Sequence, residues 1–280
     1  MVRIPNQKTV LITGASVGIG RELAKLFALD GYDLVLVARD RVRLADFADE
    51  LQNQSGITAK SFPLDLTGNS APQFLFDQLA RENIAVDVLV NNSGYGRRGA
   101  FSEVAAEESL GQIALNVTAL TLLTKLFLDP MLARKSGKIL NVASTAGFQP
   151  GPTMAVYYAT KAYVISFSEA LADELRGTGV SVTCLCPGVT DTNFQKRGNR
   201  RQHFVSPPTA NGRGHRGPRW ISWTHEWQTA GDFRTQELAA RRITASDAAQ
   251  AGHCGLAQIV GMISIYLLCD DQLHLCAMCD

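Results

Sequence analysis

Cysteine is absent from the first 183 residues, and all five histidines lie beyond residue 200. The missing cysteines exclude a disulfide framework over the N-terminal two thirds of the chain. Near the C-terminus, Cys276 and Cys279 form a single CxxC pair. A zinc site there would need two further ligands at a suitable spacing, so we predict no metal site.

The net charge is also small, because 27 Lys and Arg residues are nearly balanced by 26 Asp and Glu residues. A formal charge of +1 excludes bulk attraction to nucleic acid or to an anionic membrane. No uninterrupted apolar run is long enough to span a membrane, and residues 1–8 lack a signal-peptide layout. We therefore expect a cytoplasmic protein with neither a nucleic-acid nor a membrane partner.

What is present is an alternation of short apolar runs and longer helical patterns, which continues to about residue 195. This alternation is typical of a parallel sheet with helices on both faces. The predicted strands are Val10–Thr13, Leu34–Ala38, Thr58–Leu64, Val86–Val90, Lys138–Ala143 and Val180–Cys186. The predicted helices are Gly20–Leu29, Val42–Gln54, Ala71–Glu82, Glu107–Leu128 and Tyr157–Arg176. We predict an α/β fold with a doubly wound parallel sheet, as one domain over residues 1–195.

The pattern breaks at residues 196–242, which hold ten Lys and Arg, three Asp and Glu, and all three tryptophans. This irregular basic segment fits either an exposed arm that binds RNA or translation of a shifted frame. We favour the second, because a regular texture returns near residue 245. Residues 243–280 are predicted to contain a helix, Ser246–Ala257, and a last strand or short helix, Ile259–Leu268.

The most specific local signal is a glycine-rich turn with the sequence TGASVGIG at residues 13–20. It follows an apolar strand and opens a helix. Its glycines allow a tight turn and a close backbone approach to a pyrophosphate, while the helix N-terminus supplies N–H donors. We predict a dinucleotide site here. The same letters also read as the GxSxG elbow of serine hydrolases, a rival that would need a histidine from beyond residue 200.

The end of the second predicted strand bears on the choice of cofactor. An acidic residue at this position would bind the ribose 2′-hydroxyl and repel a 2′-phosphate. The strand instead ends in Ala38 and is followed by Arg39, whose guanidinium suits the 2′-phosphate of NADP. We therefore predict that NADP(H) is preferred, while Asp40 keeps NAD(H) as an alternative.

A tyrosine and a lysine lie one helical turn apart at Tyr157 and Lys161 and share a helix face. A nearby ammonium favours the phenolate, so we expect Lys161 to lower the pKa of Tyr157. Ser144 ends the fifth predicted strand, at the sheet edge where open α/β sheets bind ligands. Asn116 lies in the preceding helix. Taken alone, this spacing also fits ordinary packing.

Over about residues 7–195 the order of these motifs resembles the short-chain dehydrogenase/reductase family, whose fold is Rossmann-like. The motifs are TGASVGIG at 13–20, Asp65-Leu66, Asn91-Asn92-Ser93-Gly94, Asn116, Ser144, YxxxK at 157–161, and Pro187-Gly188 with Thr192. The family usually has Ala in place of Ser93.

The resemblance implies a set of cofactor-binding residues. They are Gly14, Ser16, Gly18, Ile19, Gly20, Arg39, Asp65, Leu66, Asn92, Gly94, Tyr157, Lys161, Pro187, Gly188 and Thr192. In the family, the residue equivalent to Asp65 contacts adenine. The Asn-Asn-x-Gly turn supports the central strand, and the Pro-Gly loop with Thr192 holds the nicotinamide end.

The resemblance also implies an oxidoreductase that interconverts a carbonyl and a hydroxyl of a small molecule by hydride transfer. Tyr157 would donate the proton and Ser144 would bond the carbonyl oxygen. Lys161 would hold the nicotinamide ribose, and Asn116 would position a water. The family further implies a homo-oligomer. A catalytically impaired dinucleotide-binding protein is the alternative, because residues 196–242 do not look like the family's substrate-covering segment.

Overall fold

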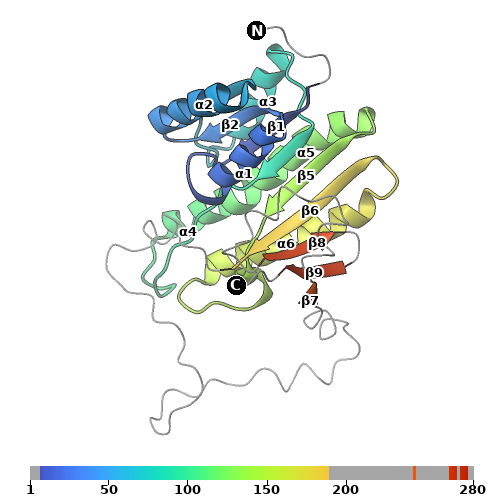
Figure 1. Cartoon of the computed structure of the whole chain (residues 1–280). Helices are drawn as coiled ribbons and strands as arrows, with labels where there is room; N and C mark the ends of the chain where they lie inside the picture. The colour runs from blue at the N-terminus through green and yellow to red at the C-terminus, as the bar shows by residue number, and fades with distance from the viewer. Residues whose placement is uncertain (1–6, 189–241, 244–264, 270–271, 277–280) are drawn as a thin grey trace.

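Strands and helices alternate along most of this protein, as the sequence predicts. The computed structural model describes residues 7–188, 242–243, 265–269 and 272–276 (Figure 1). The strands of the main unit are β1 (Thr9–Thr13), β2 (Asp33–Ala38), β3 (Ala59–Pro63), β4 (Val88–Asn91), β5 (Gly137–Val142) and β6 (Val180–Pro187). Its helices are α1 (Gly18–Leu29), α2 (Arg41–Ser55), α3 (Ala71–Arg81), α4 (Ala106–Ile113), η1 (Ala114–Ala119), α5 (Leu120–Ala133), η2 (Thr145–Phe148) and α6 (Ala155–Glu174).

Six strands form one parallel sheet in the order β3-β2-β1-β4-β5-β6. Beginning at β1, the chain builds outward through β2 and β3, then returns to the other side of β1 with β4. The strand order therefore reverses between β1 and β4. Ligands of open α/β sheets bind at such a reversal, beyond the carboxyl ends of the strands. The predicted doubly wound parallel sheet is confirmed for these six strands.

Beyond β6 the sheet continues with strands that run in both directions (Figure 1). Strand β8 (Ile265–Cys269) is antiparallel to β6, β9 (Gln272–Cys276) is antiparallel to β8, and the short β7 (Arg242–Ile243) is parallel to β9. Strand β8 overlaps the last four residues of the strand alternative for Ile259–Leu268. The predicted helix Ser246–Ala257 and residues 196–241 lie outside the described residues.

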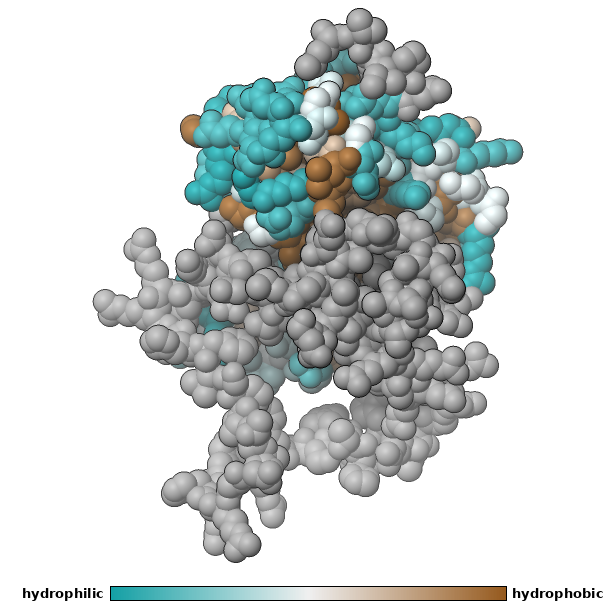
Figure 2. Space-filling view, in the orientation of Figure 1, coloured by the Kyte–Doolittle hydropathy of each residue, from teal (hydrophilic) through white to brown (hydrophobic). Residues whose placement is uncertain are grey.

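Alternating side chains of each strand enter two separate cores. On one face, Val10 and Ile12 pack with α1 and α2, while on the other Leu11 packs with α3 and α5. Strands covered on both faces read as continuous apolar runs, which is why β2 is buried along its whole length. The view in Figure 2 shows mostly hydrophilic residues on the outer side of the region where α1 and α2 lie.

One long helix runs through α4, η1 and α5 as a single unit, Ala106–Ala133. Among the described residues it is the helix that is long and apolar enough to cross a membrane, with 28 residues and a mean hydropathy of 1.4 in its most apolar window. However, Leu123, Phe127 and Met131 pack in the core against the sheet. The core helix of a soluble protein meets the same length and composition criteria, so these criteria alone do not make it a membrane span.

Candidate active site

The glycine-rich turn lies between β1 and α1, at the strand reversal. Gly14 and Gly18 adopt positive φ angles of 70° and 59°, which other residues rarely adopt. A Cβ on Gly20 would come within 2.4 Å of the Asn92 side-chain nitrogen and 2.5 Å of the Gly14 carbonyl oxygen. Only glycine therefore fits at each of these places. The predicted roles of the three glycines in a tight, closely packed turn agree with this geometry.

The turn is fastened to the end of β4 by the first residue of the motif and by Asn92. The Thr13 hydroxyl accepts hydrogen bonds from the backbone N–H groups of Asn92 and Ser93, both at 3.0 Å. The Asn92 amide donates to the carbonyls of Thr13 and Gly14 at 2.9 and 3.3 Å. These bonds fix the turn beside β4 and direct it toward the carboxyl edge of the sheet.

The other residues predicted for the turn lie where the motif places them. Ser16 is buried within the turn, and Ile19 packs against the core of α1 and α2. Helix α1 begins after Val17, and no side chain among the described residues caps its first N–H groups. Uncapped N–H groups at a helix N-terminus favour an anionic ligand such as a phosphate.

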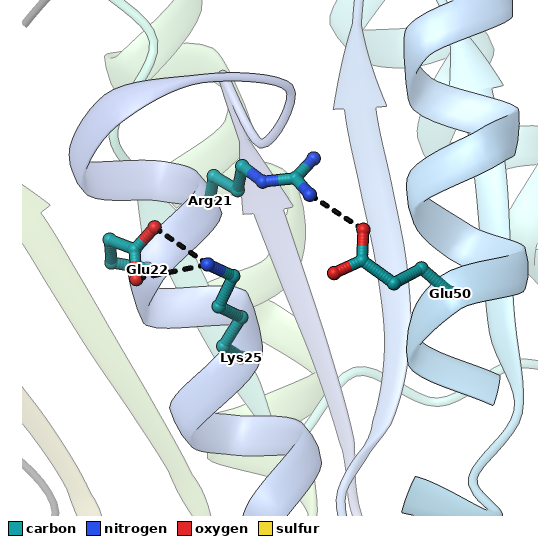
Figure 3. A network of polar contacts seen from close by, with 4 residues as sticks. All are labelled: Arg21, Glu22, Lys25 and Glu50. Atoms are coloured by element: carbon teal, nitrogen blue, oxygen red, sulfur yellow. Dashed lines mark hydrogen bonds and ion pairs between the residues drawn. The ribbon is translucent and has the colours of Figure 1, made fainter. Parts of the chain in front are cut away.

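The start of α1 is also tied to α2, as Figure 3 shows. Arg21 of α1 points toward Glu50 of α2 and pairs with it at 2.6 Å, while its guanidinium lies 3.8 Å from the centre of the Phe47 ring. Glu22 and Lys25 form a separate pair along α1 at 3.0 Å. The Arg21 contacts hold the first turn of α1, and with it the glycine-rich turn, in a fixed relation to α2.

At the end of β2 the two candidate cofactor-selecting residues have different partners. Arg39 lies 3.7 Å from the Asp65 carboxylate, and both side chains are exposed. The carboxylate of Asp40 caps α2 by accepting from the Arg43 backbone N–H at 3.1 Å. Asp40 is thus committed to helix α2, whereas Arg39 remains at the outer edge of the site.

Asp65, predicted to contact adenine, follows β3 and faces Arg39. Its carboxylate also accepts from the backbone N–H and the hydroxyl of Thr67, at 3.0 and 2.8 Å. Partial burial alone would raise its pKa, but the Thr67 bonds and the Arg39 charge leave the pKa of Asp65 below its ordinary value. Asp65 is therefore anionic at neutral pH. Its neighbour Leu66 is buried in the core.

Ser144 and Tyr157 are brought together by β5 and α6. Ser144 comes two residues after β5 and starts η2, where its oxygen accepts from the Ala146 N–H at 3.1 Å. The side chain of Ser144 is close enough to the Tyr157 phenol to oppose the rise in its pKa. Ser144 also donates to the carbonyl oxygen of Pro187 at 3.4 Å, which joins the pair to the end of β6.

The pKa of Tyr157 does not follow our expectation that Lys161 would lower it. Tyr157 is only 9% exposed, and this burial raises its pKa above the ordinary value, although the bond with Ser144 opposes the rise. The Lys161 ammonium lies 5.9 Å from the centre of the Tyr157 ring and donates to the Val142 carbonyl at 2.7 Å. Burial, rather than the charge of Lys161, therefore sets the direction of the Tyr157 pKa shift.

Lys161 is itself almost fully buried, with 5% of its surface exposed. Burial lowers its pKa to about 8, although the nearby thiols of Cys184 and Cys186 oppose that shift. A Cβ on Gly94 would lie 3.6 Å from the Lys161 ammonium nitrogen and 3.1 Å from the Asn116 side-chain oxygen. Gly94, Asn116 and Lys161 therefore lie close together.

Asn116 lies in η1, a π-helical stretch that the sequence does not reveal. Its amide nitrogen donates to the Tyr95 carbonyl at 2.9 Å and to the Thr160 hydroxyl at 3.0 Å, and its oxygen accepts from the Tyr95 N–H at 3.0 Å. Both amide donors are therefore committed to protein groups. Insertions of this kind into α-helices are frequent at functional sites.

Pro187 is the last residue of β6, and its carbonyl oxygen accepts from Ser144. Gly188 follows it in the chain. Thr192 lies outside the described residues. Two residues that the motifs did not single out also belong to the site. Thr160 joins Asn116 to the first turn of α6 by donating to the Tyr157 carbonyl at 2.7 Å, and Gly96 lies against the Tyr157 ring. Thr160 could have been noticed in the sequence because it precedes Lys161, whereas nothing in the sequence marks Gly96.

Residues 8–203 match the family model described as short chain dehydrogenase. The match covers more than half of the chain and includes every site element described above. The chain belongs to the short-chain dehydrogenase family. Its glycine-rich turn, Ser144, Tyr157 and Lys161 correspond to the motifs by which it resembles that family.

Individual family members show the same relationship. The short-chain dehydrogenase from Sphingobium yanoikuyae in complex with NADPH is 40% identical, with 68% of this chain and 74% of that chain covered and a TM-score of 0.65. The bulky-bulky ketone specific alcohol dehydrogenase from Comamonas testosteroni is 37% identical, with coverages of 66% and 73% and a TM-score of 0.63.

Among curated proteins, the "probable oxidoreductase EphD" of Mycobacterium tuberculosis is 35% identical over 186 residues. The alignment covers 66% of this chain and 31% of EphD, so the chain spans about a third of that protein.

Proposed function

We propose that this short-chain dehydrogenase is an NADP(H)-dependent oxidoreductase that interconverts a carbonyl and a hydroxyl by hydride transfer. The observation that carries the proposal is that Ser144, beyond the carboxyl end of β5, lies near the buried Tyr157, which is one helical turn before the buried Lys161. The relatives support it, since one is an alcohol dehydrogenase specific for ketones and another was solved with NADPH.

The residues present fit a dinucleotide. Gly14 and Gly20 allow the turn to pack closely against Asn92, and the N-cap Val17 leaves the first N–H groups of α1 without a side-chain cap, which suits a pyrophosphate. The pyrophosphate would lie on this turn and the adenine beside Asp65. Lys161 would hold the nicotinamide ribose, and Pro187 and Gly188 would border the nicotinamide end, together with Thr192.

The preference for the phosphorylated cofactor rests on Arg39 and Asp40. A 2′-phosphate beside β2 would meet the Arg39 guanidinium, which an exposed carboxylate at 3.7 Å only partly neutralises. The Asp40 carboxylate, which could bind a ribose 2′-hydroxyl, is instead occupied at the N-cap of α2. Both observations favour NADP(H) over NAD(H).

When bound, the nicotinamide supplies or accepts the hydride at the substrate carbon. In the direction of reduction, Tyr157 donates its phenolic proton to the carbonyl oxygen, and Ser144 donates a hydrogen bond to the same oxygen. Two donors arranged in advance where negative charge develops stabilise the transition state most. Lys161 places a positive charge beneath the Tyr157 ring. Asn116 bonds the loop at Tyr95 and the first turn of α6 at Thr160, and so holds both in place around Tyr157.

Replacing Tyr157 with Phe tests this proposal. The variant should bind NADPH as the wild type does, because the ring remains, yet should lose nearly all NADPH oxidation with ketones, aldehydes and 3-oxoacyl esters. Turnover retained by Tyr157→Phe would refute the role of the phenol. Cofactor binding by the wild type with no turnover on any of these compounds would instead support the catalytically impaired dinucleotide-binding protein. We further propose a cytoplasmic homo-oligomer with a small-molecule substrate.

A further inference from the structure

The loop that follows β4 lies directly against the ring of Tyr157. A Cβ placed on Gly96 would be 2.9 Å from two ring atoms of Tyr157 and 2.9 Å from the terminal methyl carbon of Met154. Such separations are well inside ordinary van der Waals contact, so the Gly96 backbone forms one wall of the space that the phenol occupies. The position of this loop therefore limits the space available to the Tyr157 ring.

Hydrogen bonds on both sides of Gly96 hold the loop in place. On one side, the backbone of Tyr95 makes two bonds with the Asn116 amide, at 2.9 and 3.0 Å. On the other side, the backbone N–H of Arg97 donates to the side-chain oxygen of Gln112 at 3.0 Å. Gly96 is thus held between two side chains of the same long helix.

Gln112 has no part in the reaction proposed above, yet it is 1% exposed. It lies four residues before Asn116, so both side chains project toward the loop. Its amide nitrogen donates to the Glu108 carbonyl at 3.4 Å, and the Glu108 carboxylate pairs with the Arg97 guanidinium at 3.1 Å. A buried amide needs partners for both of its ends, and Gln112 meets its acceptor requirement through the loop.

We propose that Gln112 is a positioning residue for Tyr157, which it holds toward Ser144 through the backbone of Arg97 and Gly96. The proposal rests on the proposed function of Tyr157 as proton donor. Without the Gln112 oxygen, the Arg97 N–H loses a buried partner and the loop can withdraw from the ring. A proton donor displaced by about 1 Å can cost on the order of a hundredfold in rate.

The effect should appear in kcat rather than in cofactor affinity, because Gln112 reaches the site only through the loop. Gln112→Met keeps an unbranched side chain but removes the acceptor, whereas Gln112→Glu keeps an oxygen for the Arg97 N–H. Ser109→Ala is the matched control, since Ser109 is buried in the same helix and, among the described residues, its side chain makes no bond to the loop.

We expect Gln112→Met to lower kcat by about tenfold or more, with the Kd for NADPH within about twofold of the wild type. Gln112→Glu should recover most of the lost rate, and Ser109→Ala should behave as the wild type. An unchanged kcat in Gln112→Met would overturn the proposal. So would a Gln112→Glu variant as slow as Gln112→Met, or a loss of rate that merely follows a loss of NADPH binding.

A second measurement separates this proposal from the proposed function. Hydrogen exchange of the full-length protein should show faster exchange over residues 95–97 in Gln112→Met, with β5 unchanged. The phenol of Tyr157, followed by ultraviolet titration against Tyr157→Phe, should have a pKa closer to its ordinary value in Gln112→Met. If the wild type turns over no carbonyl compound, the proposed function fails while these two results still decide the role of Gln112. Equal exchange in both proteins would overturn that role.

Discussion

Replacing Lys161 with Met should make the stability difference between variant and wild type depend on pH. The lysine is buried with its ammonium on the Val142 carbonyl, and burial lowers its pKa from 10.5 to about 8. Between these two values the unfolded chain holds the proton and the folded protein does not. Unfolding therefore takes up a proton in this window, and stability due to Lys161 rises as the pH rises from about 8 to 10.5.

The magnitude follows from the size of the shift. Below pH 8 both states carry the charge, and the folded state bears the full cost of burying it, on the order of 3 kcal/mol at about 1.4 kcal/mol per pKa unit. Met has a similar length and no charge. The stability of Lys161→Met relative to the wild type should therefore fall by about 2 kcal/mol between about pH 7 and about pH 9.5.

Urea unfolding of both proteins in reducing buffer, at several pH values across this range, measures that difference. Groups that titrate in the same way in both proteins cancel when the two are subtracted. The loss of the bond to Val142 shifts the difference by a constant amount and leaves its slope unchanged. A difference that stays level with pH, or that moves in the opposite direction, would refute the assignment of a depressed pKa to Lys161.

Three further changes test the rest of the site. Arg39→Ala should weaken NADPH binding by about tenfold or more while leaving NADH binding nearly unchanged, as measured by cofactor fluorescence; equal losses would contradict the 2′-phosphate role. Asp40→Ala should cost about 1 kcal/mol of stability in chemical denaturation through loss of the α2 cap, without improving NADPH selectivity. Gly96→Ala should lower kcat because the new methyl group would meet the Tyr157 ring, and an unchanged rate would show that the loop has room to move.

Several parts of the site could be predicted because they depend on local sequence. Tyr157 and Lys161 are four residues apart in a helical pattern, so their shared face follows from helix geometry alone. Gly14 and Gly20 are recognisable because only glycine permits the backbone of that turn. Ser144 lies two residues beyond a strand whose carboxyl end must lie at the ligand edge of a parallel sheet.

Other parts could not be predicted because they depend on residues far apart in the chain. The direction of the Tyr157 pKa shift was wrong, since the sequence shows the lysine one turn away but not the burial that outweighs it. The bonds of Gln112 and Asn116 to the loop join residues 15 and 21 positions apart. Their partners are backbone groups, which leave no mark in the sequence.

The sequence by itself determined the α/β fold class and the glycine-rich turn, because periodicity and glycine spacing are local properties of the chain. It singled out Ser144, Tyr157 and Lys161 only through the order of motifs that resembles the family. Only the tertiary structure decided which groups meet Tyr157, how deeply Lys161 is buried, and that β8 adds to the sheet in the antiparallel sense. Burial and strand direction depend on how distant segments pack together. Such packing sets the local dielectric environment and the hydrogen-bond partners that turn a motif into a chemical site.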